Sequence, residues 1–162
     1  MAMNQLPEKG SFIISIRNAR EEWQTTWDAA DKEHRMDKVA LTQPGAGGSW
    51  SAKDVIAHVT WHEREMVGMI RRRALVGSEL WNLPTDERNA AIYALNKDRS
   101  LAEVLEEAQK VYTELLEQLE MLSDEDLHNP GHFTGMPPDW EPWKVIAGNT
   151  YEHYPEHAIG LD

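Results

Sequence analysis

The chain of 162 residues contains no cysteine. This absence excludes disulfides, thiolate zinc sites, iron–sulfur clusters and a cysteine nucleophile. A transition-metal site would have to use histidine and carboxylate ligands, which favour borderline divalent ions such as zinc, nickel or iron. Long hydrophobic runs are also missing, because no apolar stretch approaches the roughly 20 residues that span a bilayer. The first twelve residues lack a basic start followed by an apolar block, so we expect no signal peptide, no membrane anchor and a cytoplasmic protein.

Basic residues are scarce, with 16 lysines and arginines against 28 aspartates and glutamates. The resulting net charge of −12 would repel a phosphate backbone, so we expect no nucleic-acid partner. Apolar residues make up 41% of the chain, which is enough for a packed interior and too many for a disordered chain. At this length, the composition predicts a single domain over residues 1–162 with one core.

Sustained alternation of branched or aromatic residues with polar ones, the mark of β-strands, is absent as well. Apolar residues recur instead at three- and four-residue steps, as on one face of a helix. The predicted helices cover residues 9–33, 51 to about 77, 85–96, 101–122 and 142–158. The connections over residues 36–50 and 128–141 are long, and the first, although rich in glycine, lacks the Lys-Ser/Thr ending of a phosphate loop. Four long helices with two long connections predict an all-α four-helix bundle.

Helix starts are marked by capping residues. Ser51 with Asp54, and Ser100 with Glu103, have the spacing of a capping box, in which each side chain bonds the other residue's backbone amide. Pro142 is a favourable first-turn residue for the last helix. These signals give the second, third and fourth long helices defined starting points.

Two pairs of histidines are separated by four residues, His58 with His62 and His153 with His157. Four residues are about one helical turn, so the two imidazoles of each pair can point the same way and bind one metal ion. Seven histidines in 162 residues also produce such spacings by chance, and a surface or hydrogen-bonded histidine is the alternative for each of them.

The neighbours of each histidine distinguish the four. His58 shares a helix side with Val55 and should face the interior, where a buried neutral imidazole needs partners for its ring nitrogens. His62 is expected to turn toward the edge of the bundle, whereas His153 and His157 should point partly inward. Three histidines from two helices, leaving one coordination position open, would form a catalytic metal site and not a closed structural one.

Two further residues bear on this hypothesis. Pro155 lies between the paired histidines and removes a backbone hydrogen bond to Tyr151, so we expect a kink that orients His157. Glu65 lies about two turns after His58 and is a candidate general base, the alternative being a carboxylate on a solvated acidic face.

Tryptophan is unusually frequent, with seven in the chain. Core packing accounts for such residues in most proteins, but two or three of them could also line an aromatic pocket. The candidates for binding a substrate in such a pocket are Trp50, Trp61, Trp81 and Trp143.

Several segments resemble one known family. Residues 50–58, WSAKDVIAH, resemble the start of the second helix in DinB-like four-helix bundle proteins. Residues 148–157, GNTYEHYPEH, resemble the closing motif of the ClbS/DfsB-like branch of that superfamily. Residues 81–96 and the following RSLAEVL of residues 99–105 are similar to the same branch. The resemblance covers nearly the whole chain.

The resemblance implies a bundle in which His58, His153 and His157 bind a divalent metal ion. It implies a metal-dependent enzyme that acts on a small electrophilic molecule, by hydrolysis or by transfer of a low-molecular-weight thiol, and a homodimer. An alternative is a non-metal, ClbS-like protein that binds or destroys a small molecule in a tryptophan-lined pocket. A third possibility is a structural or dimerisation module.

Overall fold

The computed structural model describes residues 7–32 and 50–159, and within them it is all-α, without a β-strand. The predicted connection over residues 36–50 lies outside the described residues except for its last one. The single domain over residues 1–162 stays a prediction. The α-helices are α1 (Lys9–Lys32), α2 (Ala52–Arg72), α3 (Thr85–Asn96), α4 (Leu101–Glu120) and α5 (Pro142–Gly148). Short 3-10 helices are η1 (Glu79–Asn82), η2 (Glu125–Leu127), η3 (Pro130–His132) and η4 (Tyr154–His157).

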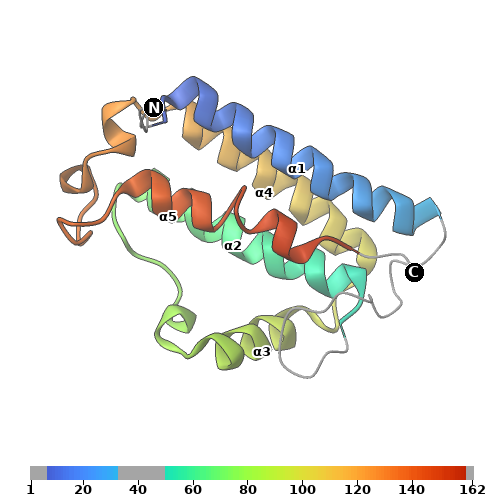
Figure 1. Cartoon of the computed structure of the whole chain (residues 1–162). Coiled ribbons are helices and arrows are strands. Elements are labelled where there is room, and N and C mark those ends of the chain that lie inside the picture. The colour runs from blue at the N-terminus through green and yellow to red at the C-terminus, as the bar shows by residue number, and fades with distance from the viewer. Residues whose placement is uncertain (1–6, 33–49, 160–162) are drawn as a thin grey trace.

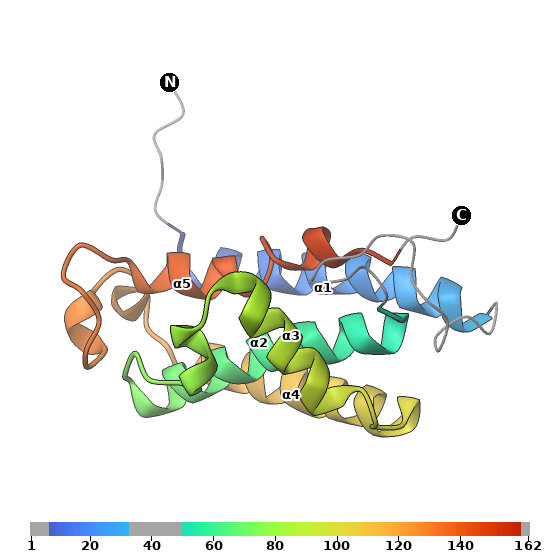
Figure 2. The same cartoon turned by 90° about the horizontal axis from the view of Figure 1, so that it is seen from below.

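The long helices α1, α2 and α4 run side by side, and the C-terminal segment of α5 and η4 takes the fourth place in the bundle (Figure 1). Seen from below, α1 and the α5–η4 segment form one layer, while α2 and α4 form the other (Figure 2). The helix α3 lies outside the bundle and packs on α2. None of the helices in the described part of the chain is long and apolar enough to cross a membrane.

The predicted capping boxes of α2 and α4 are both present. The Ser51 hydroxyl accepts a hydrogen bond from the backbone amide of Asp54, and the Asp54 carboxylate accepts one from the amide of Ser51 at 2.9 Å. Ser100 and Glu103 repeat this arrangement at the start of α4. Because these pairs satisfy backbone amides that no helical carbonyl can reach, the sequence alone places both helix starts.

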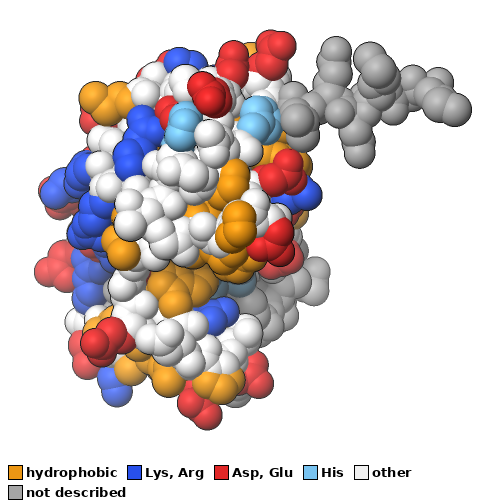
Figure 3. All heavy atoms as spheres, turned by 90° about the vertical axis from the view of Figure 1, so that its left-hand side faces the viewer, with side chains coloured by type: hydrophobic (Ala, Val, Ile, Leu, Met, Phe, Trp, Pro, Cys, Tyr) orange, Lys and Arg blue, Asp and Glu red, His pale blue; other side chains and the backbone are white. Residues whose placement is uncertain are grey.

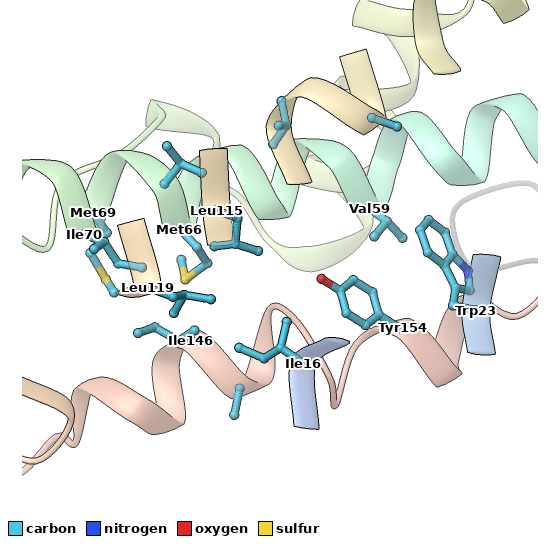
Figure 4. Close-up of a cluster of buried hydrophobic side chains, with 14 of the residues drawn as sticks. Ile16, Trp23, Val59, Met66, Met69, Ile70, Leu115, Leu119, Ile146 and Tyr154 are labelled. Atoms are coloured by element: carbon cyan, nitrogen blue, oxygen red, sulfur yellow. The ribbon is translucent and has the colours of Figure 1, made fainter. Parts of the chain in front are cut away.

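Apolar side chains from all four members of the bundle meet in one core. Ile16 of α1, Ile70 of α2, Leu115 of α4 and Ile146 of α5 have almost no exposed surface, and Figure 4 shows them facing the same interior. Burying a side chain of this size contributes about 1.5–3 kcal/mol. The periodic stripes therefore identify the core faces correctly.

The predicted end of the second helix was wrong by several residues. The helix α2 ends at Arg72, and Arg73 takes a left-handed conformation with φ 50°, instead of continuing to Gly77. The chain after Arg73 is held by backbone hydrogen bonds with Thr134, whose amide donates to the Arg73 carbonyl at 2.9 Å and whose carbonyl accepts from Leu75 at 2.8 Å. In this segment the hydrogen bonds with Thr134 take the place of helical ones.

The prediction of one helix over residues 142–158 was also wrong. The helix α5 ends at Gly148, Asn149 leaves helical geometry with φ −109° and ψ 3°, and η4 follows after a series of turns. Glycine weakens a helix, and Pro155 cannot donate to the carbonyl of Tyr151, so both residues disfavour a continuous helix. The two C-terminal histidines are thus presented by turns and a 3-10 helix.

Candidate metal centre

Four buried histidines converge between α2 and η4. His58 and His62 come from α2, while His153 precedes η4 and His157 ends it. Each is at most 7% exposed. The ring centroids of His58 and His157 are 4.7 Å apart, and those of His62 and His153 are 4.3 Å apart. Folding therefore brings together two histidine pairs that are about ninety residues apart in the chain.

Several ring nitrogens in this cluster lack an ordinary partner. The Nε2 atoms of His153 and His157 face each other at 2.6 Å. The Nδ1 atoms of His58, His153 and His157 are buried without a hydrogen bond. An unpaired buried polar atom costs about 1–3 kcal/mol, so a site that leaves three of them is costly unless something binds there. Clustered imidazole nitrogens are a donor set that suits zinc, nickel or iron.

His62 differs from the other three because one of its nitrogens is paired. Its Nδ1 lies 2.8 Å from the side-chain oxygen of Asn149. The amide nitrogen of Asn149 donates to the carbonyl of Val145 at 2.8 Å, which fixes the orientation of that amide. The imidazole must then donate its proton from Nδ1, leaving a lone pair on Nε2. A hydrogen bond of this kind orients metal-binding histidines in many proteins.

All four imidazoles are held in the neutral form. Burial lowers the pKa of His58 to about 2 and the pKa values of His62 and His157 to about 4. Burial also lowers the pKa of His153, and repulsion from His62 and His157 adds to the effect. Because a metal ion binds the neutral imidazole, the cluster is in its ligand form at neutral pH.

Ligand atoms of His58, His62 and His153 lie within 4.8 Å of one another, and so do those of His153, Glu156 and His157. The three predicted ligands, His58, His153 and His157, are all in the cluster. The expectation that His62 turns toward the edge was wrong, since only 6% of its surface is exposed. The ring of Trp81 from η1 and the side chain of Asn149 lie against His62, on the side that the sequence pattern leaves as an edge.

Glu65 lies apart from the ligand groups formed by the histidines. Its carboxylate is partly buried and accepts a hydrogen bond from the backbone amide of Ser78, at 3.0 and 3.3 Å from its two oxygens. The contact gives Glu65 a structural role at the start of η1. Its function as a general base stays a prediction.

A second buried carboxylate was missed. Glu63 is fully buried, and its Oε2 accepts hydrogen bonds from Arg20 Nε at 3.2 Å and from the Tyr154 hydroxyl at 2.7 Å. The guanidinium of Arg20 also lies over the ring of Trp27, at 4.7 Å from its centroid. The position of Arg20 within the apolar stripe of the first helix is the sequence signal that could have revealed this network.

Three of the four predicted tryptophans surround the histidines. The centroid of Trp50 lies 5.3 Å from that of His58, and Trp61 and Trp81 lie 5.0 and 5.5 Å from His62. Trp143 makes no ring contact with a histidine among the described residues and lies in α5, where Lys144 reaches its ring. Aromatic rings thus enclose the histidine cluster on the side of α3 and η1.

Comparison with known proteins gives the same fold. An uncharacterised protein from Escherichia coli UTI89 superposes with a TM-score of 0.68 at 17% identity, covering 98% of this chain and 100% of the other. DfsB, described as a sibling lethal factor precursor, superposes with a TM-score of 0.74 at 18% identity, covering 96% and 94%. None of the curated proteins matches the chain. The family model of the DinB superfamily matches residues 16–159, and the chain therefore belongs to that superfamily.

Proposed function

We propose that this protein is a metal-dependent enzyme that acts on a small electrophilic molecule, by hydrolysis or by transfer of a low-molecular-weight thiol. The observation that carries the proposal is the convergence of four buried histidines, three of which have an unpaired Nδ1. His58, His153 and His157 are the proposed ligands, and His62 is a fourth candidate. Membership of the DinB superfamily supports a metal site of this kind.

A divalent ion bound there would supply activation of a water or thiol, or polarisation of a substrate carbonyl. The chain's own residues prepare the site for it. Asn149 orients His62, and burial keeps the imidazoles neutral. The packed rings of Trp50 and Trp61 exclude water from one side of the cluster, which strengthens electrostatic interactions within it.

Metal analysis of protein purified without a histidine tag tests the proposal. The His58→Ala variant should lose stoichiometric metal, because it removes a ligand from the centre of the cluster. The His132→Ala variant is the matched control and should keep its metal, since His132 is partly exposed and pairs with Asp126 outside the cluster. Full metal content in His58→Ala, measured by elemental analysis, would contradict the assignment.

A second candidate function is a non-metal protein that binds or destroys a small hydrophobic molecule. The aromatic rings beside His62, namely Trp61 and Trp81, favour it. Chelation separates the two functions, because binding without a metal would survive it, as read from tryptophan fluorescence. The homodimer and the cytoplasmic location stay predictions for either function.

A further inference from the structure

A pocket of about 540 Å³ opens beside the histidine centre. Its walls come from the second half of α2, the segment over residues 75–82 and α5, with Trp140 from the connection before α5. Figure 3 shows the face on the left of Figure 1, where hydrophobic side chains gather in the middle between the upper and lower parts of the molecule. The volume lies in the range of small-molecule sites, which is about 300–1,000 Å³.

The wall that faces α2 is held in place before any ligand binds. Gly77 has no side chain, and a Cβ there would lie 2.6 Å from the Glu65 carboxylate and 3.0 Å from the Trp81 indole nitrogen. The same carboxylate accepts from the amide of Ser78. Together with the backbone hydrogen bonds to Thr134 described above, these contacts fix the segment that forms the wall.

The pocket lies next to His62, which does not itself line it. Asn149 and Trp81 line it, and both contact that imidazole, Asn149 through a hydrogen bond and Trp81 with ring centroids 5.5 Å apart. Residues three, four and seven positions after His62 share its face of α2, and all three of them, Glu65, Met66 and Met69, line the pocket. A molecule in the pocket would therefore lie against the side of the histidine centre.

The lining indicates the chemistry of the ligand. It contains seven large apolar side chains, of which Val76 and Trp140 are 50% and 45% exposed. Its charged members are the carboxylates of Glu65 and Glu79, and it contains no lysine or arginine. Arg88 lies over the ring of Trp81, at 5.0 Å, but does not line the pocket. Apolar walls with two carboxylates favour an uncharged molecule over an anion.

We propose that this pocket binds the substrate of the histidine centre, and that the substrate is an uncharged, largely apolar small molecule. The reaction at the histidines rests on the proposed function, whereas binding in the pocket does not. A bound molecule of this class would cover the exposed surfaces of Val76 and Trp140, and burial of apolar area would supply its affinity.

Two fluorescent probes that differ by one sulfonate test the charge preference. N-phenyl-1-naphthylamine is uncharged, and 8-anilinonaphthalene-1-sulfonate is its anionic counterpart. The protein should bind the uncharged probe at least about tenfold more tightly, which corresponds to about 1.4 kcal/mol. The Val76→Arg variant should weaken binding of the uncharged probe and tighten binding of the anion. Ile14→Arg, at an aliphatic position on α1 that is 57% exposed, is the matched control and should behave as the parent protein.

The same samples separate this proposal from the proposed function. Equal affinity of the parent protein for both probes would overturn the proposal that this pocket binds an uncharged molecule. Identical probe binding by Val76→Arg and Ile14→Arg would overturn it as well. If the purified parent protein contains no metal but still prefers the uncharged probe, only the metal-dependent function is overturned. In NMR spectra the uncharged probe should shift the ring signals of His62 and leave those of His132 in place, and an unmoved His62 would refute the link between pocket and centre.

Discussion

The buried side chain of Glu63 connects several elements of this fold. Its Oε2 binds Arg20 of α1 and Tyr154 of η4, so one carboxylate joins three members of the bundle. Burial raises its pKa, and the charge of Arg20 and the hydroxyl of Tyr154 oppose that shift. A buried pair of this kind is costly to break, because the remaining charge is left without a partner.

We therefore expect Glu63→Gln to destabilise the protein by about 3–5 kcal/mol, since it leaves the guanidinium of Arg20 buried without a counter-charge. Urea unfolding measures this change. Glu114→Gln is the control, because Glu114 pairs with Arg71 at 3.8 Å on the surface and should contribute no more than about 1 kcal/mol. Similar losses of unfolding free energy in the two variants would show that the buried pair stabilises the protein no more than the surface pair does.

Sequence patterns identified which residues form the site better than they identified the directions in which the side chains point. The spacing of His58 and His62 and the closing motif marked all four histidines, but the burial of His62 depends on Trp81 of η1, which lies about twenty residues further along the chain. Asn149 orients His62 through a contact across 87 residues, and no local pattern reveals such a contact. Side-chain direction on a helix buried on most sides is a tertiary property.

Elements with consistent local signals were predicted well, and the element with conflicting signals was not. Ser51 and Ser100 fix the starts of α2 and α4 through their own neighbours, so their sequence is sufficient. In the C-terminal segment the local signals conflict, because Gly148 and Pro155 disfavour a helix whereas the apolar residues keep a helical spacing. Its apolar spacing fits a helix up to Ala158, yet the backbone amide of Glu152 reaches five residues back to Ala147 and the regular helix has ended. Contacts with α1 and α2 outweigh the periodic pattern there.

The position of η4 depends on contacts that a small substitution can test. The Tyr154 ring stacks on Trp23 with centroids 5.6 Å apart, and both side chains are labelled in Figure 4. The Tyr154 hydroxyl donates to Glu63, and the indole of Trp23 donates to the His157 carbonyl at 2.7 Å. Burial raises the pKa of Tyr154 well above its usual value, so it remains a donor. These contacts hold η4, and with it His157, against α1 and α2.

The variant Tyr154→Phe should cost about 1–3 kcal/mol, because it removes a buried donor from Glu63. It should also weaken metal binding by about 10–100-fold, as loss of an orienting group does at other metal sites. Unfolding in urea and competition with a chelator measure the two effects. Tyr151→Phe removes a hydroxyl that is only partly buried, and both quantities should stay near their original values. Unchanged metal affinity in Tyr154→Phe would show that η4 holds its place without this contact.

At the scale of the whole molecule, the bundle encloses four histidines that cannot easily be protonated, and this couples stability to pH. Their pKa values are lowered in the folded protein, so below the ordinary value of 6.5 the unfolded chain binds protons that the folded one does not. The metal-free protein should therefore lose stability as pH falls from about 6.5 toward 4.

Each histidine contributes on the order of 2 kcal/mol of this loss between pH 6.5 and pH 5, at about 1.4 kcal/mol per pKa unit. Glu63, whose pKa is raised, acts in the opposite direction, but it is one group against four. Urea unfolding of metal-free protein at pH 7 and pH 5 measures the slope. A metal-free protein as stable at pH 5 as at pH 7 would mean that the histidines become protonated without unfolding, and that the bundle does not keep them buried and neutral.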